Sequence, residues 1–438
     1  MPDDKEPVVV IGGGAAGMVA AWKAGSLGAR VVLIERNLKL GIKLLISGGG
    51  KCNITHAGER EDIQSAFSPR EGRFLRPALF RFSNNDILTL LNNKGIATTT
   101  RPDGKVFPAS GRAKDVVDAL TEYLRMANVD VRLGTPVRSI EATGGCVSGI
   151  VLAGEHLKSH AAVLATGGVS YPKTGTTGEG FAWARTLGHS IAPLRAALAP
   201  IAVAPGFPAS WRGVALRGGC LSVIAENRKI SEWQGDLLFT HEGISGPAAL
   251  EVSASAARAL EGGAVTLRYD FFPSTSFPDL DRTLNETILN QRSKMIETIL
   301  ERWLPNRIVP HLLATLRIDP STRGYRLTRE QRRSITFLLK SWGLGQVSHI
   351  PIDRGEVTAG GVELGEVDPQ TMGSRVVRGL FICGEVLDVA GPVGGYNLQA
   401  AFSTGYVAGE SAAAIWLGSS AGSQLSLHRK ESSPSGPC

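Results

Sequence analysis

Three glycines near the N-terminus, Gly12, Gly14 and Gly17, have the G-x-G-x-x-G spacing that brings a backbone close to phosphate. Gly12 permits a tight turn, Gly14 has no side chain to keep a pyrophosphate away, and Gly17 lets a helix pack closely on a strand. The free N–H groups and positive end of that helix favour an anion. Glu35, farther along, can accept hydrogen bonds from ribose hydroxyls, and its charge would repel a 2′-phosphate.

The elements around these residues support the same interpretation. Val8 to Ile11 is a β-branched run typical of a buried parallel strand, residues 15–27 can form an Ala-rich helix, and residues 31–34 form a second buried strand. A glycine-rich turn that binds nothing is the alternative. Strand, turn, helix, strand and acid occur here in the order that an adenine dinucleotide site requires. This pattern by itself leaves FAD and NAD open.

A second glycine loop, residues 47–50 with the sequence SGGG, comes shortly afterwards and leads to Asn53. Consecutive backbone N–H groups in such a loop can form an anion-binding nest. Taken alone it could be only a turn. Because it follows the first glycine motif so closely, we expect it to contact the same dinucleotide.

Length and composition indicate a soluble globular protein of two or three domains, with 438 residues, 43% hydrophobic and 20% charged. The five cysteines are scattered and contain no C-x-x-C pair, so no zinc site or disulfide framework is expected. The N-terminus is polar and acidic, and no long apolar run is present. We therefore expect a cytoplasmic protein with no membrane contact and no metal.

The formal net charge of +7 is concentrated in one stretch. Residues 281–340 contain twelve Lys/Arg and six Asp/Glu, a surplus of six. Such a stretch is usually a solvated helical surface, and a nucleic-acid surface is the more specific alternative.

The pattern along the chain changes three times, near residues 195, 278 and 355. Residues 61–126 are mainly helical, and strands are predicted at 129–133, 137–140, 147–152 and 161–165. Period-2 patterns predict an antiparallel β unit over 195–275, and helical patterns follow over 278–345, with helices at 285–304 and 329–342. Strand texture returns at 355–362 and 379–383, before a final helix at 400–416 and a disordered polar tail at 418–438.

Two further features decide between the cofactors. Ala165, Thr166 and Gly167 form the ATG signature of FAD-binding flavoproteins, and Glu385 resembles their acidic ribityl ligand. The spacing from Gly175 to Gly180 is wrong for a second dinucleotide fingerprint. The sequence therefore indicates non-covalent FAD, and any NAD(P)H would bind only transiently as an electron donor.

Several long segments together resemble one family. They are GIKLLISGGGKCNIT, ATGGVSYPKTGTTGEGF, GDLLFTHEGISGP, VTAGGV and GLFICGEVLDVAGPVGGYNLQAAFSTGYVAG. They resemble the BaiN/YhiN/RdsA family of NAD(P)/FAD-dependent oxidoreductases, also labelled aminoacetone-oxidase-like flavoproteins, over about residues 7–410. The TGTTGEGFAWARTLG segment is more distantly similar to fumarate reductase flavoproteins.

The resemblance implies an α/β fold with a Rossmann-like FAD-binding domain of the glutathione-reductase or fumarate-reductase type. That domain would be discontinuous, over 1–193 and 351–417, with an inserted β-barrel-plus-helical substrate or cap domain at 194–350. The FAD contacts implied by position are Gly12, Gly14, Ala15, Ala16, Gly17, Glu35, Arg36, Lys43, Ser47, Gly48, Gly49, Asn53, Val137, Ala165, Thr166, Gly167, Gly384, Glu385, Gly395, Asn397, Leu398 and Gln399.

The function that follows is an FAD-dependent oxidoreductase that moves a hydride through flavin N5 to or from a small organic substrate. The helix start near Asn397 would place N–H groups where they stabilise the reduced flavin. His241, in the loop Phe239 to Pro247, is the candidate catalytic residue, because histidine can supply a proton near neutral pH, although a structural turn is an equal alternative. A flavoprotein that acts on or binds RNA, and a non-catalytic FAD sensor, are the rival functions.

Overall fold

The computed structural model describes residues 5–418 and separates into two compact units. Unit 1 contains the chain up to Leu194 and again from Thr358 onward, and unit 2 contains Arg195 to Val357. The predicted disordered tail lies, beyond Gly418, outside the described residues. Across residues 5–418, every helix is too short or too polar to span a bilayer.

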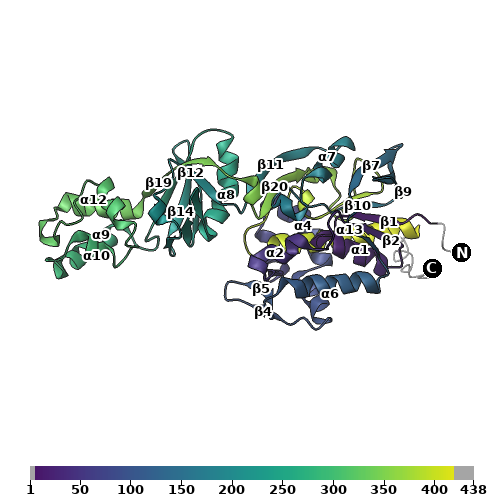
Figure 1. Ribbon diagram of the computed structural model, residues 1–438, viewed down its shortest axis with the longest axis horizontal. Helices are drawn as coiled ribbons and strands as arrows, with labels where there is room; N and C mark the ends of the chain where they lie inside the picture. The colour runs from purple at the N-terminus through teal and green to yellow at the C-terminus, as the bar shows by residue number, and fades with distance from the viewer. Residues whose placement is uncertain (1–4, 419–438) are drawn as a thin grey trace, which may run out of the picture. The chain divides into compact units, whose positions relative to one another are not determined.

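Unit 1 is built on a five-stranded parallel sheet (Figure 1). Its strands, in order across the sheet, are β21 (Leu380–Ile382), β10 (Ala162–Leu164), β1 (Val8–Ile11), β2 (Val31–Ile34) and β6 (Asp130–Arg132). β1 and β2 are buried at every position, as strands covered on both faces require. Since β2 lies on one side of β1 and β10 on the other, the chain reverses its winding direction between β1 and β10, where open α/β sheets bind ligands.

Helices α1 (Ala15–Ser26) and α13 (Tyr396–Leu417) pack against each other beside this sheet (Figure 1). A Cβ on Gly405 would lie 2.3 Å from the Ala16 carbonyl oxygen, and one on Gly409 would lie 2.1 Å from that of Ala20. These two glycines therefore allow the two helix backbones to touch. The remaining helices of unit 1 are α2 (Ile42–Gly50), α3 (Arg60–Ser65), α4 (Pro69–Arg81), α5 (Asn84–Asn92), α6 (Ala113–Met126) and α7 (Glu179–Thr186).

Three small sheets complete the parallel-sheet region and its connections. They are β3 (Thr55–His56) with β5 (Lys105–Pro108) and β4 (Thr98–Thr100); β7 (Val137–Thr143) with β8 (Cys146–Leu152) and β9 (His156–Lys158); and β11 (Ile191–Ala197) with β20 (Val357–Val362). The predicted strands at 129–133, 137–140, 147–152 and 161–165 and the helical stretch at 61–126 are confirmed in type.

Unit 2 contains an eight-stranded antiparallel sheet and four helices beyond α8 (Pro247–Leu260), which packs on β14 and β15. The strands, from one edge to the other, are β13 (Ala215–Leu216), β16 (Leu237–Phe239), β17 (Gly243–Ser245), β12 (Ile201–Ala204), β19 (Trp342–His349), β18 (Val265–Asp270), β14 (Cys220–Ala225) and β15 (Arg228–Gln234). The helices are α9 (Phe277–Asn290), α10 (Ile296–Leu300), α11 (Val309–Thr315) and α12 (Arg329–Lys340).

Four details of unit 2 correct the sequence-based expectations. The sheet has two edges, β13 and β15, where a barrel was expected, and α8 lies inside the stretch expected to be all β. The helix predicted over 285–304 is two helices, because the chain turns after Asn290 and restarts at Ile296. The helix predicted over 329–342 ends at Lys340, because Trp342 starts β19 and is buried in the core of unit 2.

Candidate functional site

Four strands of the parallel sheet are followed directly or within two residues by predicted cofactor-binding residues. Gly12 follows β1, Glu35 follows β2, the segment 165–167 follows β10, and Gly384 and Glu385 begin two residues after β21. Because the strands are parallel, their carboxyl ends share one edge of the sheet. The fold therefore brings together residues that are far apart in the sequence.

The three glycines of the first motif have two roles: Gly12 and Gly17 allow close packing, and Gly14 leaves open space. A Cβ on Gly12 would lie 2.4 Å from the Ala165 oxygen, and one on Gly17 would lie 1.8 Å from the Gly12 oxygen. A Cβ on Gly14 would meet no atom of the described chain within 4 Å. Gly14 is also the N-cap of α1, which has no side-chain cap and no acid in its first turn. An uncapped helix start facing open space fits a phosphate.

Glu35 is buried, and its carboxylate is held in place by backbone and side-chain donors. Oε2 accepts the Gly13 N–H at 2.7 Å, and Oε1 accepts the backbone and side-chain nitrogens of Asn37 at 2.8 and 2.7 Å. Since each carboxylate oxygen has two acceptor sites, the group can still accept from a ribose hydroxyl. The Arg36 guanidinium forms an ion pair at 2.7 Å with Glu179, the first residue of α7.

The second glycine loop departs from helical geometry within α2. Ser47 has an extended ψ of 147°, and Gly48 and Gly49 have φ values of 56° and 68°, which side chains rarely adopt. Asn53, with its amide oxygen turned to Gly395, accepts that N–H at 3.0 Å. Burial raises the pKa of the neighbouring Cys52 thiol to about 12, so this thiol is not a nucleophile at neutral pH.

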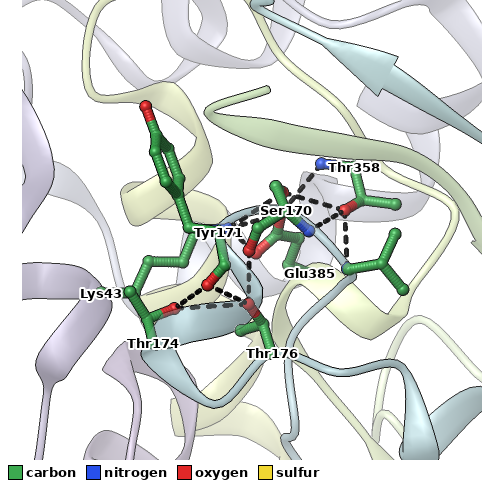
Figure 2. Close-up of polar contacts among 8 residues, drawn as sticks. Lys43, Ser170, Tyr171, Thr174, Thr176, Thr358 and Glu385 are labelled. Carbon is green, nitrogen blue, oxygen red and sulfur yellow. Dashed lines mark hydrogen bonds and ion pairs between the residues drawn. The ribbon is translucent and has the colours of Figure 1, made fainter. Parts of the chain in front are cut away.

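Lys43 and Glu385 form the charged centre of the edge (Figure 2). The Lys43 Nζ lies 2.9 and 2.7 Å from the two Glu385 oxygens and 3.3 Å from the Ser170 hydroxyl. Glu385 also accepts the Thr358 N–H at 2.9 Å and the Ser170 hydroxyl at 3.2 Å. The two side chains are mostly covered, with 25% of Lys43 and 19% of Glu385 exposed. A ligand that replaced one of these contacts would meet a preformed donor or acceptor.

The start of α13 carries the last predicted cofactor residues. Gln399 is fully buried, and its amide bonds to Thr55, Phe82 and Ser403, so that side chain serves the fold. Asn397 exchanges hydrogen bonds with the backbone of Gly391. The backbone N–H groups of a first helical turn have no intrahelical acceptor and can face a ligand. Three of the predicted contacts are structural in part: Leu398 packs on the core of unit 1, Val137 is buried at the start of β7, and the Gly384 N–H donates to Thr404.

His241, the predicted catalytic residue, belongs to unit 2 and lies in a tight turn between β16 and β17. The Thr240 N–H donates to the Gly243 carbonyl at 2.8 Å, and the Thr240 hydroxyl accepts the Gly243 N–H at 3.1 Å. The His241 side chain is 58% exposed, with its Nε2 3.3 Å from the Glu242 carboxylate. Its ring therefore does not hold this turn together.

Three polar residues of unit 1 were missed by sequence reasoning. Ser170 and Thr358 lie in the quoted segments ATGGVSYPKTG and VTAGGV, which could have been searched for hydroxyls, and both contact Glu385. His56 follows the CNIT run and stacks on Tyr396 with ring centroids 4.6 Å apart. Among residues 5–418, no cluster of three His, Cys, Asp or Glu could hold a metal.

Comparison with known proteins agrees with these features. The model of the family described as "HI0933-like protein Rossmann domain" matches residues 6–411. The chain is 32% identical over 416 residues to a 3-dehydro-bile acid delta(4,6)-reductase of Clostridium scindens, covering 92% of this chain and 98% of the relative. It is also 32% identical over 407 residues to a ribosomal RNA dihydrouridine synthase of Escherichia coli, covering 91% and 96%.

Among solved structures, a 3-ketosteroid delta1-dehydrogenase of Sterolibacterium denitrificans aligns with a TM-score of 0.48 at 14% identity, covering 94% of this chain and 99% of that one. The family match spans nearly all described residues and includes both glycine loops and the ATG segment. The chain therefore belongs to the HI0933-like Rossmann-domain family, as the sequence motifs indicated.

Proposed function

We propose that this protein is an FAD-dependent oxidoreductase that transfers a hydride through flavin N5 to or from a small organic substrate, with NAD(P)H as the electron donor. Its family is one of flavin-dependent oxidoreductases. One relative that matches nearly the whole chain is named a bile acid reductase. The observation that carries the proposal is the open, uncapped start of α1 at Gly14, beside the fixed carboxylate of Glu35.

Different residues of unit 1 would bind different parts of the cofactor. The α1 start would bind the pyrophosphate, and Glu35 would bind the adenosine ribose. Glu385, with Lys43 beside it, would accept hydrogen bonds from the ribityl hydroxyls. The first turn of α13 would donate N–H groups to the pyrimidine end of the ring, where negative charge gathers on reduction.

Anaerobic reduction of the purified protein tests the proposal. The protein should be yellow, and denaturation should release its flavin, because the cofactor is held without a covalent bond. NADH and NADPH are then mixed separately with the enzyme in a stopped-flow instrument, followed by a screen of oxidants. A colourless protein that ignores added FAD contradicts the cofactor, and a flavin that neither nicotinamide reduces contradicts the donor.

His241 is proposed to give or orient a proton during substrate turnover. Because its side chain is exposed and does not support the turn, His241→Ala should leave the FAD content and Tm nearly unchanged. Reoxidation of the reduced flavin by the substrate should slow by roughly 10²-fold, the size of a lost acid–base group. Unchanged reoxidation in a folded variant removes His241 from the mechanism.

A second candidate function is the binding of RNA, which one surface of unit 2 favours. We name the residues Arg292, Met295, Arg323, Tyr325 and Arg326 the arginine face. The Tyr325 N–H donates to the Arg292 carbonyl at 3.0 Å, and the Arg326 guanidinium lies 5.7 Å from the Tyr325 ring centre. Tyr325 is 53% exposed and Met295 44%. Exposed aromatic rings beside arginines are how proteins stack single-stranded bases.

A salt-dependent binding assay with single-stranded RNA distinguishes this candidate. The double variant Tyr325→Ala, Arg326→Ala should bind about tenfold more weakly if the arginine face contacts RNA, since one stacked base is worth ~1–3 kcal/mol. Arg112→Ala, which removes an exposed arginine of unit 1, is the matched control. Equal weakening by both variants would indicate non-specific charge attraction only.

A further inference from the structure

Two segments of unit 1 that are more than three hundred positions apart are joined residue by residue. The first is residues 53–56, at the end of the second glycine loop, and the second is residues 394–399, at the start of α13. Three hydrogen bonds join them: Asn53 with Gly395 at 3.0 Å, Thr55 with Gln399 at 2.7 Å, and His56 with Gly394 at 3.1 Å. A Cβ on Gly395 would lie 2.6 Å from the Thr55 backbone, so the segments are in direct contact. A change at one of them acts on the other.

His56 is the titratable member of this junction. Its ring stacks on Tyr396, the first residue of α13, at an interplanar angle of 19°. Its Nδ1 faces the Gly394 carbonyl, so the neutral ring donates there and leaves Nε2 as a proton acceptor. Gly104 covers that side: a Cβ on it would lie 2.2 Å from Nε2. The ring is therefore fixed at the N-terminal end of α13 but remains half-buried.

The other ionisable groups near His56 lie on β5 and α13. Lys105 lies opposite His56 on β5 and forms an ion pair with Asp103 at 2.8 Å, so the two nearly cancel. Tyr396 is the titratable group that faces His56 from α13. Among the described residues, no salt bridge reaches the His56 ring. Histidine is the side-chain type that most readily exchanges a proton with solvent at physiological pH.

We propose that His56 is a positioning residue that couples proton uptake to reduction of the flavin. This inference rests on the proposed function, which puts the pyrimidine end of FAD at the start of α13. His56 and the start of α13 would lie beside the end of FAD that would gain negative charge if a hydride, which brings two electrons and one proton, came to it from the nicotinamide. The imidazole then takes one further proton from solvent, adding positive charge to that of the helix start. Linkage requires the converse: a protonated His56 makes the flavin easier to reduce.

The midpoint potential of bound FAD, measured with redox dyes between pH 5.5 and 8.5, tests the coupling. His56→Asn keeps a donor for Gly394 but cannot titrate. We expect it to lower the ratio of reduced to oxidised flavin about tenfold at pH 5.5, which for two electrons is about 30 mV. The difference from wild type should vanish by pH 8.5. His156→Asn, which removes an exposed histidine paired with Glu141, is the matched control and should change nothing.

Proton uptake is measured separately with a pH indicator dye in weakly buffered solution as the flavin is reduced by dithionite. Near pH 7, wild type should take up more protons per flavin than His56→Asn. Equal uptake, or equal potentials at every pH with full FAD occupancy, overturns the coupling while leaving the proposed function intact. Loss of FAD from His56→Asn would make His56 part of the cofactor cradle and also overturn it. A wild-type protein that binds no FAD overturns the proposed function itself.

Discussion

Two of the hydroxyl-containing networks of unit 1, each built around an ionisable group, differ in how many of their hydrogen-bonding sites are already occupied. At the carboxyl edge of the sheet, Lys43 contacts Glu385, and both side chains keep a fifth to a quarter of their surface exposed. In the second network, His189 is completely buried, with Nδ1 3.1 Å from Glu366 and Nε2 2.8 Å from the Ser374 hydroxyl. On distances alone, the second resembles a catalytic triad more than the first does.

The acceptor sites show why the second network is structural. The Ser374 oxygen already accepts the N–H groups of Val376 and Val377 at 3.0 and 2.8 Å, while its proton faces His189. An oxygen with both lone pairs engaged is not available to attack a carbonyl. The Lys43 and Glu385 pair instead lies at the carboxyl edge of the sheet, where Glu385 follows β21 and Lys43 is on α2, and both side chains stay partly exposed. A binding site is therefore indicated by exposed hydrogen-bonding atoms at the carboxyl edge of the sheet more than by a triad-like set of residues.

The largest expected effect comes from adding one side chain at the proposed cofactor site and comparing it with the same change beside the second network. Gly14→Val should abolish FAD binding, because the branched side chain would occupy the space that a pyrophosphate needs. Gly14 has an ordinary φ of −83°, so the variant should fold. Gly365→Val is the matched control beside the second network, since a Cβ there also meets no atom of the described chain. Normal flavin content in Gly14→Val, measured from its absorbance spectrum, would contradict the placement.

The next effect tests the charge at the carboxyl edge. Lys43→Met keeps the length of the side chain but leaves the Glu385 carboxylate without its cation. A charge-assisted hydrogen bond is worth ~1.5–3 kcal/mol, and partial exposure reduces this, so we expect FAD to bind about tenfold more weakly. Titration of the apoprotein with FAD measures the change in Kd.

Lys114→Met is the control for that measurement. Lys114 forms an exposed pair with Asp118 on α6, with 73% and 57% of the side chains exposed. Such surface pairs contribute ~0–1 kcal/mol to stability, and this one has no part in the proposed site. If both variants bind FAD as wild type does, Lys43 and Glu385 belong with the structural network.

The glycine motif, both buried strands and the final helix could be predicted from the sequence because each depends on local pattern. Val8 to Ile11 is continuous and β-branched, and the three glycines have a spacing with one common purpose. In unit 2 the same method missed α8 and β19. Residues 247–260 are rich in Ala and Ser within a β-rich stretch, and β19 contains two glycines that weaken its strand pattern.

The contacts of the candidate site were harder to predict because they join distant segments. Nothing local to Lys43 indicates that its partner is Glu385, 342 positions away, or that Thr358 will donate to the same carboxylate. Gln399 was assigned to the cofactor by its motif, but its amide is buried among Thr55, Phe82 and Ser403. A sequence motif locates a binding site, but only the fold shows which of its side chains face the ligand and which stabilise the surrounding structure.

The smallest expected effect is a pH dependence that belongs to the second network. Burial lowers the pKa of His189 below its ordinary value of 6.5, and the hydrogen bond and charge of Glu366 offset this only in part. The unfolded chain therefore binds more protons than the folded one as the pH falls below 6.5. Stability that is fully present above pH 6.5 should then decline progressively toward pH 5.

Thermal unfolding of the apoprotein at pH 7.5, 6.5, 5.5 and 5.0 measures this decline. Glu366 contributes little in that range: burial raises its pKa, but bonds from Ser190 and His189 lower it overall, so its stabilising effect is lost only below about its ordinary value of 4.5. His189→Gln cannot titrate, so its Tm should be lower than that of wild type at pH 7.5 but should fall less on acidification. If the Tm of His189→Gln instead falls more steeply than that of wild type, folding raises the pKa of His189 and its ring is protonated in the folded protein. Its ring nitrogens would then both donate, Ser374 would have to accept a third hydrogen bond, and the contrast between the two networks would fail.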